Sequence, residues 1–238
     1  MKKALSVLLA GAMLAGVLAG CGNGGNNGSS DEAGNPNAFK VGGTGPLTGA
    51  DAIYGNAVKN GAELAVEEIN AEGGDIQFEL RIEDDESDPE KAYNCYNKLT
   101  DWGMQLSLVS VTSKPAEAIS VNLYEDRIFG LTPSASSVAV TEGKDNVYQM
   151  CFIDPDQGTT AADYIADNNL GSKIAIIYKN DDVYSTGIYE TFVAEAEARG
   201  LEVVSVSTFT TASSTDFSVQ LNDAKNNGAD LVFLPMYY

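Results

Sequence analysis

The chain contains no histidine among its 238 residues. Without an imidazole it can build neither a Ser-His-Asp triad nor an HExxH zinc site, and it lacks the commonest general base of enzymes. The sequence also has no GxxxxGK[ST], CxxC or GxSxG pattern. These absences argue against most hydrolases and predict that the protein holds neither a metal nor a cofactor.

Basic residues are scarce, with 14 lysines and arginines against 34 aspartates and glutamates, which gives a net charge of −20. A chain of this charge repels phosphate backbones, so a nucleic-acid partner is excluded. An acidic surface needs no partner beyond water to explain it. The hydrophobic content of 44% is sufficient for a real core, and the length predicts one or two domains.

Cysteine is nearly absent: only Cys21, Cys95 and Cys151 occur. Cys95 shares one face of a helical pattern with Leu99 and Trp102, which predicts a small buried apolar residue rather than a metal ligand. A Cys95–Cys151 disulfide stays open but disfavoured, because two cysteines in a sequence fix neither the distance nor the geometry of a bridge.

The N-terminus has the pattern of an export signal. Lys2 and Lys3 precede an apolar run from Ala4 to Ala19, which is shorter than the roughly 20 residues of a membrane-spanning helix. The run ends in Leu-Ala-Gly-Cys21, which resembles the bacterial lipobox, whose cysteine becomes the lipid-modified first residue. We therefore expect residues 1–20 to be a lipoprotein signal peptide and Cys21 to be lipidated. An uncleaved short anchor is the alternative.

Residues 21–38 are rich in glycine, asparagine and serine and predict a flexible tether. From Phe39 onward, short apolar runs alternate with helical patterns, which predicts an α/β fold of two doubly wound lobes with parallel sheets. We expect an N-terminal lobe over 39–153 and a second lobe over 154–238, with Asp154 to Gly158 as the crossover. The second lobe is expected to be incomplete and to expose apolar surface, since the chain stops soon after the predicted strand Leu231–Leu234.

Two turns rich in hydroxyl groups follow neighbouring strands of this pattern. The apolar run Leu106–Val111 leads into Thr112 and Ser113, and the run Ile128–Leu131 leads into residues 132–137, Thr-Pro-Ser-Ala-Ser-Ser. Ligands of open α/β sheets bind outside the carboxyl ends of the strands, where N–H groups and hydroxyls can hold an anion. The turns therefore predict a site for a small-molecule carboxylate. The plainer alternative is that these serines only cap helices.

A dinucleotide site is the competing hypothesis. Residues 42–49, Gly-Gly-Thr-Gly-Pro-Leu-Thr-Gly, follow a strand, as the glycine-rich loop of a Rossmann enzyme does. The third glycine is missing, however, and Pro46 keeps a helix from opening directly on a pyrophosphate. A Rossmann-type enzyme is therefore the disfavoured alternative.

A series of short motifs in a fixed order resembles a known family. The sequence is similar to the branched-chain amino-acid-binding (Leu/Ile/Val-type) solute-binding proteins of ABC transporters, which have the periplasmic binding protein type I fold. The motifs are Gly45–Gly49 with Tyr54-Gly55, Gly61–Ala65, Ile69-Asn70 with Gly73-Gly74, Asp84-Asp85 with Asp88-Pro89, Thr112-Ser113, Thr132–Ser136 and Asp156–Gly158.

The resemblance implies a role for each matching residue. It implies that Ser113 and the turn from Ser134 to Ser136 hold the carboxylate of the ligand, and that Asp154 holds the ammonium. It also implies that Tyr54, Tyr184 and Tyr237 flank the pocket. Asp182 is expected to stay solvated. The family's glycine before the Thr-Ser turn is replaced here by Val109 and Ser110.

The function implied by the resemblance is capture without chemistry. We expect an extracytoplasmic lipoprotein that holds a small amino acid, branched-chain or otherwise aliphatic, between its lobes and delivers it to the permease of an ABC transporter. The lipid anchor would attach it to the cell membrane. The alternatives are an amide, urea or an aromatic acid as ligand, or service as a sensor subunit.

Overall fold

A computed structural model describes residues 37–238 of the chain. The predicted signal peptide, Cys21 and nearly all of the predicted tether lie outside these residues. Among the helices of residues 37–238, none is both long enough and apolar enough to cross a membrane.

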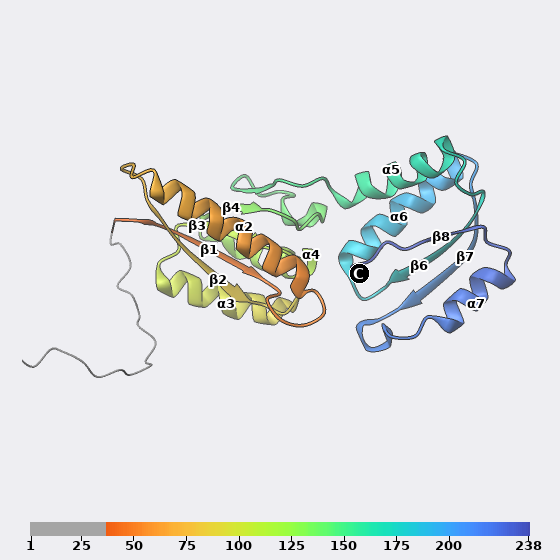
Figure 1. Cartoon of the computed structure of the whole chain (residues 1–238), viewed down its shortest axis with the longest axis horizontal. Helices are drawn as coiled ribbons and strands as arrows, with labels where there is room; N and C mark the ends of the chain where they lie inside the picture. Colours follow the sequence, from red (N-terminus) through yellow and green to blue (C-terminus); the bar gives the residue numbers. More distant parts are fainter. Residues whose placement is uncertain (1–36) are drawn as a thin grey trace, which may run out of the picture. The chain divides into compact units, whose positions relative to one another are not determined.

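The first half of the described chain forms a five-stranded parallel sheet in the order β2-β1-β3-β4-β5 (Figure 1). The strand order reverses direction between β1 and β3, which is the point where open α/β sheets commonly bind ligands. The prediction of a parallel sheet is confirmed. The strands are β1 (Phe39–Gly45), β2 (Phe78–Asp84), β3 (Leu106–Ser110), β4 (Phe129–Thr132) and β5 (Val147–Gln149).

Three helices and a short 3-10 turn accompany this sheet: α2 (Ala52–Ala71), α3 (Pro89–Trp102), α4 (Ser113–Glu125) and η1 (Val138–Val140). Helix α3 begins after Asp88, whose side chain accepts the N–H groups of Glu90 and Lys91 at 2.9 Å each. It ends at Gly103, whose φ of 92° is the left-handed conformation that closes helices. The core lies between the sheet and helices α3 and α4, with Leu99, Ile119 and Leu123 among its largest buried side chains.

Helix α2 covers the sheet less closely than the sequence predicts. The sequence predicts that Ala62, Leu64, Ala65, Val66 and Ile69 form the apolar face of this helix, but only Ala62 and Val66 are half-buried. Residues four apart share one helix face, so these two face the sheet, while Leu64 and Ile69 remain 56% and 42% exposed. The prediction was therefore wrong for Leu64, Ala65 and Ile69.

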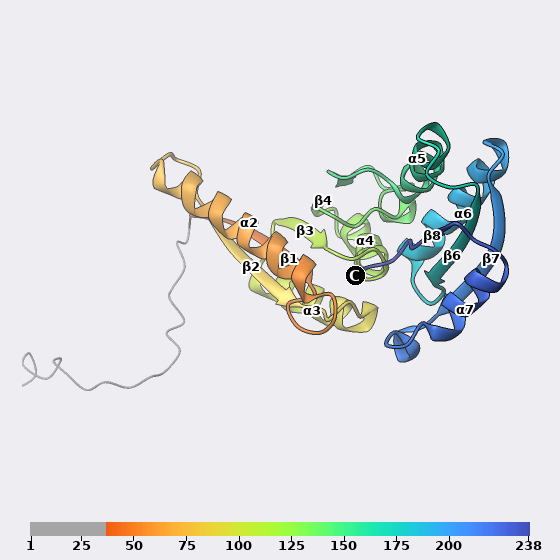
Figure 2. The same cartoon turned by 45° about the vertical axis from the view of Figure 1, so that its right-hand side comes forward.

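The second half of the described chain forms a three-stranded parallel sheet in the order β7-β6-β8. Its strands are β6 (Lys173–Lys179), β7 (Glu202–Phe209) and β8 (Leu231–Phe233). Helices α5 (Asp154–Asp167) and α6 (Val183–Ala198) lie side by side, and α7 (Ser218–Asn226) lies across β6 and β7 from α6 (Figure 2). The short turn η2 (Thr211–Ser213) follows β7. This is again the doubly wound arrangement that the sequence predicts.

The two helices α5 and α6 approach each other at Gly158. A Cβ atom at this position would lie 2.1 Å from Thr191 Oγ1, 2.4 Å from the carbonyl oxygen of Ile188 and 2.7 Å from the nitrogen of Phe192. Two of these three atoms belong to the backbone of α6 and cannot move aside as a flexible side chain could. Glycine is therefore required for the contact between the helices.

The crossover between the sheets is not where the sequence predicts it. The segment Asp154 to Gly158 is the start of α5, and the link consists of residues 150–153, after β5 has ended at Gln149. Pro155 does not prevent the helix from starting at Asp154. Proline is compatible with the first turn of a helix, where the N–H that it lacks would have no partner within the helix. Asp154 and Asp156 in the same turn suit the positive end of the helix dipole.

Both cysteines of the described chain are free thiols. Cys95 is buried in α3 beside Tyr96 and Leu99, as predicted, while Cys151 is half-buried in the link between the sheets. Residues 37–238 thus contain no disulfide.

Candidate functional site

The two hydroxyl-rich turns meet through Ser113, the first residue of α4. Its hydroxyl oxygen accepts the N–H of Ser136 at 3.2 Å and the N–H of Ser137 at 3.3 Å. Ser113 is fully buried and Ser136 is 3% exposed. The carboxyl ends of β3 and β4 are neighbours, so the turns that the sequence places after them form one structure.

Thr132, the last residue of β4, fixes the same two turns to each other. Its hydroxyl donates to the carbonyl oxygen of Ser110 at 3.1 Å and accepts the N–H groups of Ala135 at 2.9 Å and Ser134 at 3.3 Å. The Ser110 hydroxyl in turn donates to the buried carboxylate of Asp85 at 2.6 Å. Buried polar groups with every partner in place hold one geometry, so the turns are rigidly placed.

The replacement of the family's glycine does not remove the turn after β3. Val109 takes a positive φ of 39°, which valine rarely adopts. The pairing of β3 with β1 shifts by one residue at this point, and the N–H of Val109 donates to the Ser107 hydroxyl at 2.9 Å. The bulge and this hydrogen bond hold the strained backbone in place.

Asp154, the first residue of α5, lies against the second turn. Its Oδ1 accepts the Ser136 hydroxyl at 2.6 Å and the Gln157 amide at 3.2 Å. Its carboxyl group packs closely against Gly187 of α6, where an added Cβ would lie only 3.3 Å from Oδ2. Burial raises the pKa of Asp154 to about 6, and the negative charges of Asp182 and Glu117 act in the same direction. Among residues 37–238 no lysine or arginine forms an ion pair with it.

Tyrosine rings line the space beside these groups. The rings of Tyr184 and Tyr237 stack with centroids 4.5 Å apart and an angle of 18° between their planes. Tyr54 meets Tyr237 edge-on at 5.3 Å, and its hydroxyl accepts the N–H of Tyr238 at 3.1 Å. The cavity has a volume of about 230 Å³, and its lining residues are Tyr54, Pro133, Ser134, Ser136, Cys151, Phe152, Gln157, Tyr184, Met236, Tyr237 and Tyr238.

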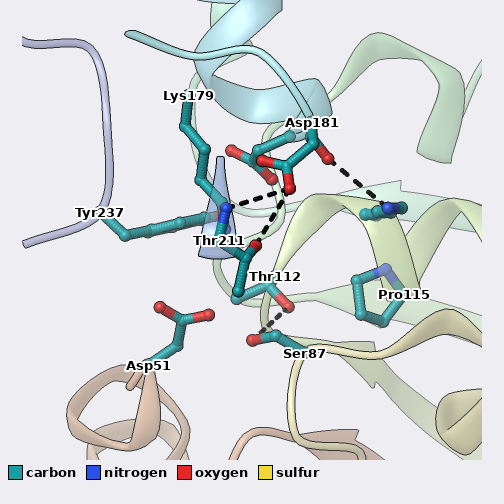
Figure 3. Close-up of a pocket in the computed structure, with 10 residues that line it drawn as sticks. Asp51, Ser87, Thr112, Pro115, Lys179, Asp181, Thr211 and Tyr237 are labelled. Atoms are coloured by element: carbon teal, nitrogen blue, oxygen red, sulfur yellow. Dashed lines mark hydrogen bonds between the residues drawn. The ribbon is translucent and has the colours of Figure 1, made fainter. Parts of the chain in front are cut away.

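A second, polar crevice of about 70 Å³ shares Tyr237 with this cavity (Figure 3). The carboxylate of Asp181 accepts both the N–H and the hydroxyl of Thr211 at 3.1 Å. The Lys114 ammonium, exposed beside Ser113, donates to the carbonyl oxygen of Asp181 at 3.5 Å. Asp181, Thr211 and Lys114 in this crevice are therefore already bonded within the chain.

Asp182, which also lines the crevice, was expected to stay solvated, and this prediction was wrong. It is 8% exposed and caps α6 by accepting the N–H of Ser185 at 3.0 Å and its hydroxyl at 3.1 Å. Desolvation by burial raises the pKa of Asp182. The preceding residue, Asp181, is exposed, whereas the Asp182 side chain turns inward to cap α6.

The structure gathers the seven predicted ligand residues of the described chain in one place. Tyr54, Ser134, Ser136, Tyr184 and Tyr237 line the cavity, while Ser113 and Asp154 are joined to it by hydrogen bonds to the Ser136 N–H and hydroxyl. Their roles towards a ligand stay predictions.

The sequence-based prediction missed several residues of the site. Thr132 and Gln157 lie within the family motifs, but no role of their own was predicted for them from the sequence. Nothing in the sequence indicated that Cys151 or Phe152 lines the cavity. Within residues 37–238, no group of three or more Cys, Asp or Glu side chains could hold a metal ion.

Comparison with known proteins gives consistent matches. The sequence profile of the family described as "Periplasmic binding protein" matches residues 38–237. The Leu/Ile/Val-binding protein BraC3 of Rhizobium johnstonii is 33% identical over 196 residues, which cover 81% of this chain and 53% of that protein. The chain thus spans about half the length of the curated relatives that it matches.

Solved structures agree with this result. The branched-chain amino acid transporter substrate binding protein LivJ of Streptococcus pneumoniae, in complex with isoleucine, superimposes with a TM-score of 0.78 at 29% identity, over 84% of this chain and 57% of that one. A solute binding protein from R. palustris, in complex with 4-hydroxybenzoate, gives a TM-score of 0.74 at 25% identity, over 84% and 54%. The resemblance to the Leu/Ile/Val-type proteins and the type I fold is confirmed.

Proposed function

Because this chain belongs to the periplasmic binding protein family, we propose that it is the solute-binding component of an ABC transporter that captures a small zwitterionic amino acid. A branched-chain or other aliphatic amino acid is the preferred ligand. The observation that carries this proposal is the pairing of hydrogen-bond donors with one buried, unneutralised carboxylate around a single cavity. Such a site complements a ligand that is negative at one end and positive at the other.

The donor half of the site suits a carboxylate. Ser113 begins α4, where backbone N–H groups have no partner within the helix and attract an anion. The Ser134 side chain lines the cavity from the second turn. Since Thr132 holds both turns in place, these donors need not reorganise when a ligand arrives.

The acceptor half suits an ammonium. Asp154 is 2% exposed, and burying a carboxylate without a counter-charge costs free energy. A ligand ammonium that reached this carboxylate would supply the missing counter-charge. The attraction of this arrangement is specific to free amines, because an acylated nitrogen carries no charge.

An aromatic acid is the second candidate ligand. Four tyrosines line the cavity, and flat rings stack well on aromatic side chains. The similar structure that holds 4-hydroxybenzoate supports this alternative. An aromatic acid would leave Asp154 without a counter-charge, which is why an amino acid is preferred.

Delivery and location follow from the same proposal. A binding protein without chemistry of its own would close on its ligand and release it to a permease outside the cytoplasm, held at the membrane by a lipid on Cys21. Replacing Cys21 by Ala should release the protein from the membrane fraction. Retention of the Cys21→Ala variant as firmly as the parent would contradict the anchor.

The proposed function is tested by ligand-dependent melting of the complete protein. Leucine, isoleucine or valine at about 100 times its dissociation constant should stabilise the protein by about 2.7 kcal/mol, since only the folded state binds. 4-Hydroxybenzoate, urea and a nicotinamide cofactor serve as comparisons. A shift with 4-hydroxybenzoate alone would favour the aromatic-acid alternative, and a shift with the cofactor alone would favour a Rossmann-type enzyme.

A further inference from the structure

Gln157, near the start of α5, is hydrogen-bonded both to Asp154 and to Tyr184 of α6. Its Nε2 donates to Asp154 Oδ1 at 3.2 Å and to the Ser136 hydroxyl oxygen at 3.4 Å. Its Oε1 accepts the Tyr184 hydroxyl at 3.3 Å. Gln157, Ser136 and Tyr184 line the cavity, whereas Asp154 is 2% exposed. The amide therefore connects a buried acid with a ring at the cavity wall.

The carboxylate of Asp154 determines the direction of each hydrogen bond in this chain. An ionised carboxylate has lone pairs but no proton, so the amide nitrogen of Gln157 must face it. The Oε1 atom is then left for Tyr184, and because a carbonyl oxygen can only accept, the Tyr184 hydroxyl must donate. The Ser136 hydroxyl likewise donates its proton to Asp154. Both hydroxyl protons are therefore engaged within the chain, and a ligand would meet only the lone pairs of these oxygens.

We propose that Gln157 is a positioning residue that makes the Tyr184 hydroxyl an acceptor, so that this end of the cavity recognises an ammonium and discriminates against a carboxylate. This inference rests on the proposed function, which places the ammonium of the ligand at this end. An ammonium has three N–H groups to satisfy. Since Oδ1 of Asp154 already accepts two hydrogen bonds from the chain, a further acceptor such as the Tyr184 oxygen is needed.

Calorimetry of leucine binding to the complete protein tests the proposal in a double-mutant cycle of Gln157→Leu and Tyr184→Phe. Phenylalanine keeps the ring that stacks on Tyr237 and removes only the hydroxyl. Tyr184→Phe should weaken leucine binding about ten-fold or more, the value of one hydrogen bond to a charged group. It should have little effect when Gln157→Leu is already present, because the hydroxyl is then no longer held as an acceptor. Equal effects in the two backgrounds would overturn the proposal.

Acetyl-leucine distinguishes this positioning role from general support of the cavity. Its nitrogen carries no charge, so Gln157→Leu should weaken leucine about ten-fold or more and acetyl-leucine much less. Gln220→Leu is the matched control, because Gln220 is also half-buried but donates to the carbonyl oxygen of Thr208 and does not line the cavity. It should bind both ligands like the parent. Equal losses for leucine and acetyl-leucine in Gln157→Leu would overturn the proposal.

The pH dependence of leucine binding is a second readout that mere support of the cavity would not change. Burial raises the pKa of Asp154 to about 6, and the hydrogen bond from Gln157 opposes that rise. The other titratable groups around this carboxylate, all unchanged in Gln157→Leu, are Asp182, Glu117, Cys151 and Tyr184. The midpoint of the pH profile should therefore move to higher pH in Gln157→Leu and stay in place in Gln220→Leu. An unchanged midpoint in Gln157→Leu would contradict the proposal.

Melting of the ligand-free variants separates this inference from the proposed function. Tyr184→Phe should lower Tm by a few degrees, about the shift for one lost hydrogen bond, but not when Gln157→Leu is present. Equal shifts in both backgrounds would refute the contact, whatever the ligand. A parent that binds leucine but fails the cycle refutes only this inference. A parent that binds no free amino acid refutes the proposed ligand and the role of Gln157 towards an ammonium together.

Discussion

The two sheets contribute chemically opposite halves of one site. The five-stranded sheet brings donors, namely the N–H groups at the start of α4 and the Ser134 side chain in the turn after β4. The helices of the three-stranded sheet bring an acceptor and an aromatic face, namely Asp154 on α5 and Tyr184 on α6. The proposed amino-acid ligand satisfies both halves because it carries opposite charges at its two ends.

The two halves also differ in how they are braced. The donor turns are fixed by buried hydrogen bonds through Thr132, whereas Asp154 is placed by the packing of α5 on α6 at Gly158. The position of the donor turns depends on a few directed hydrogen bonds of Thr132, whereas the contact between α5 and α6 depends on Gly158 having no side chain. Substitutions at Thr132 and at Gly158 should therefore affect stability and binding to different extents.

The largest effect is expected at Gly158. Gly158→Ala places a methyl group against the backbone of α6 and should destabilise the complete protein by about 3 kcal/mol, near the upper end of overpacking costs. Gly61→Ala is the matched control, because Gly61 lies within α2 with nothing within 4 Å of an added Cβ. It should stabilise by about 0.5–1 kcal/mol. Urea unfolding of both variants measures the difference, and equal stabilities would contradict the close helix contact.

The donor half is next, at Thr132. Thr132→Val keeps the shape of the side chain but leaves the N–H of Ala135 and the carbonyl of Ser110 without their partner, which should cost about 2 kcal/mol of stability. Leucine affinity should fall as well, because the turns lose their fixed geometry. Thr132→Ser, which keeps the hydroxyl, should retain most of that affinity. A Thr132→Val variant that binds like the parent would show that the turns need no brace.

The acceptor half predicts a pH dependence of binding. Asp154 has a pKa of about 6 and must be ionised to attract an ammonium, so leucine affinity should be about ten-fold lower at pH 5 than at pH 7. The chain has no histidine to titrate in this range. Calorimetry across pH 5–7 on the parent and on Asp154→Asn provides the test; an identical slope in both would assign the effect to another group.

The stability of the ligand-free protein should respond to pH in the opposite direction. The folded pKa of Asp154 is raised above its ordinary value of 3.8, so the folded state binds the proton more tightly than the unfolded state between these two values. The contribution of Asp154 to stability is then fully present below about pH 4 and is lost as the pH rises towards 6.

The smallest effect is expected at Asp182, which shares the acidic character of Asp154 but serves as a helix cap. Asp182→Ala should cost about 1 kcal/mol of stability, because α6 loses the acceptor for the Ser185 N–H. Asp182→Asn keeps a capping oxygen and should cost less. Urea unfolding distinguishes the two, and an Asp182→Ala variant as stable as Asp182→Asn would mean that the cap contributes little.

Sequence reasoning predicted the features that local signals determine. The apolar run Lys173–Lys179 predicts a strand, and Asp88 before Pro89 predicts the start of a helix; both are observed, because these signals are local. The positions of the two turns followed from the general rule for parallel sheets. Long-range contacts could not be predicted in this way.

The long-range features that could not be predicted include one contact within the site. The Ser136 hydroxyl, expected to serve the ligand, donates to Asp154, which is 18 residues further along the chain. The burial of Asp182 depends on how α6 packs, and the exposure of Leu64 depends on which face of α2 meets the sheet. No spacing in the sequence contains this information.

The central claim is that one site recognises both charges of a free amino acid, and calorimetry with blocked ligands tests it most directly. Leucine should bind the complete protein more tightly than either leucinamide or acetyl-leucine, by roughly ten- to a hundred-fold for each lost charge-assisted hydrogen bond. Asp154→Asn should weaken leucine strongly while leaving acetyl-leucine nearly unchanged. Equal affinity of the parent for leucine and acetyl-leucine would contradict the account.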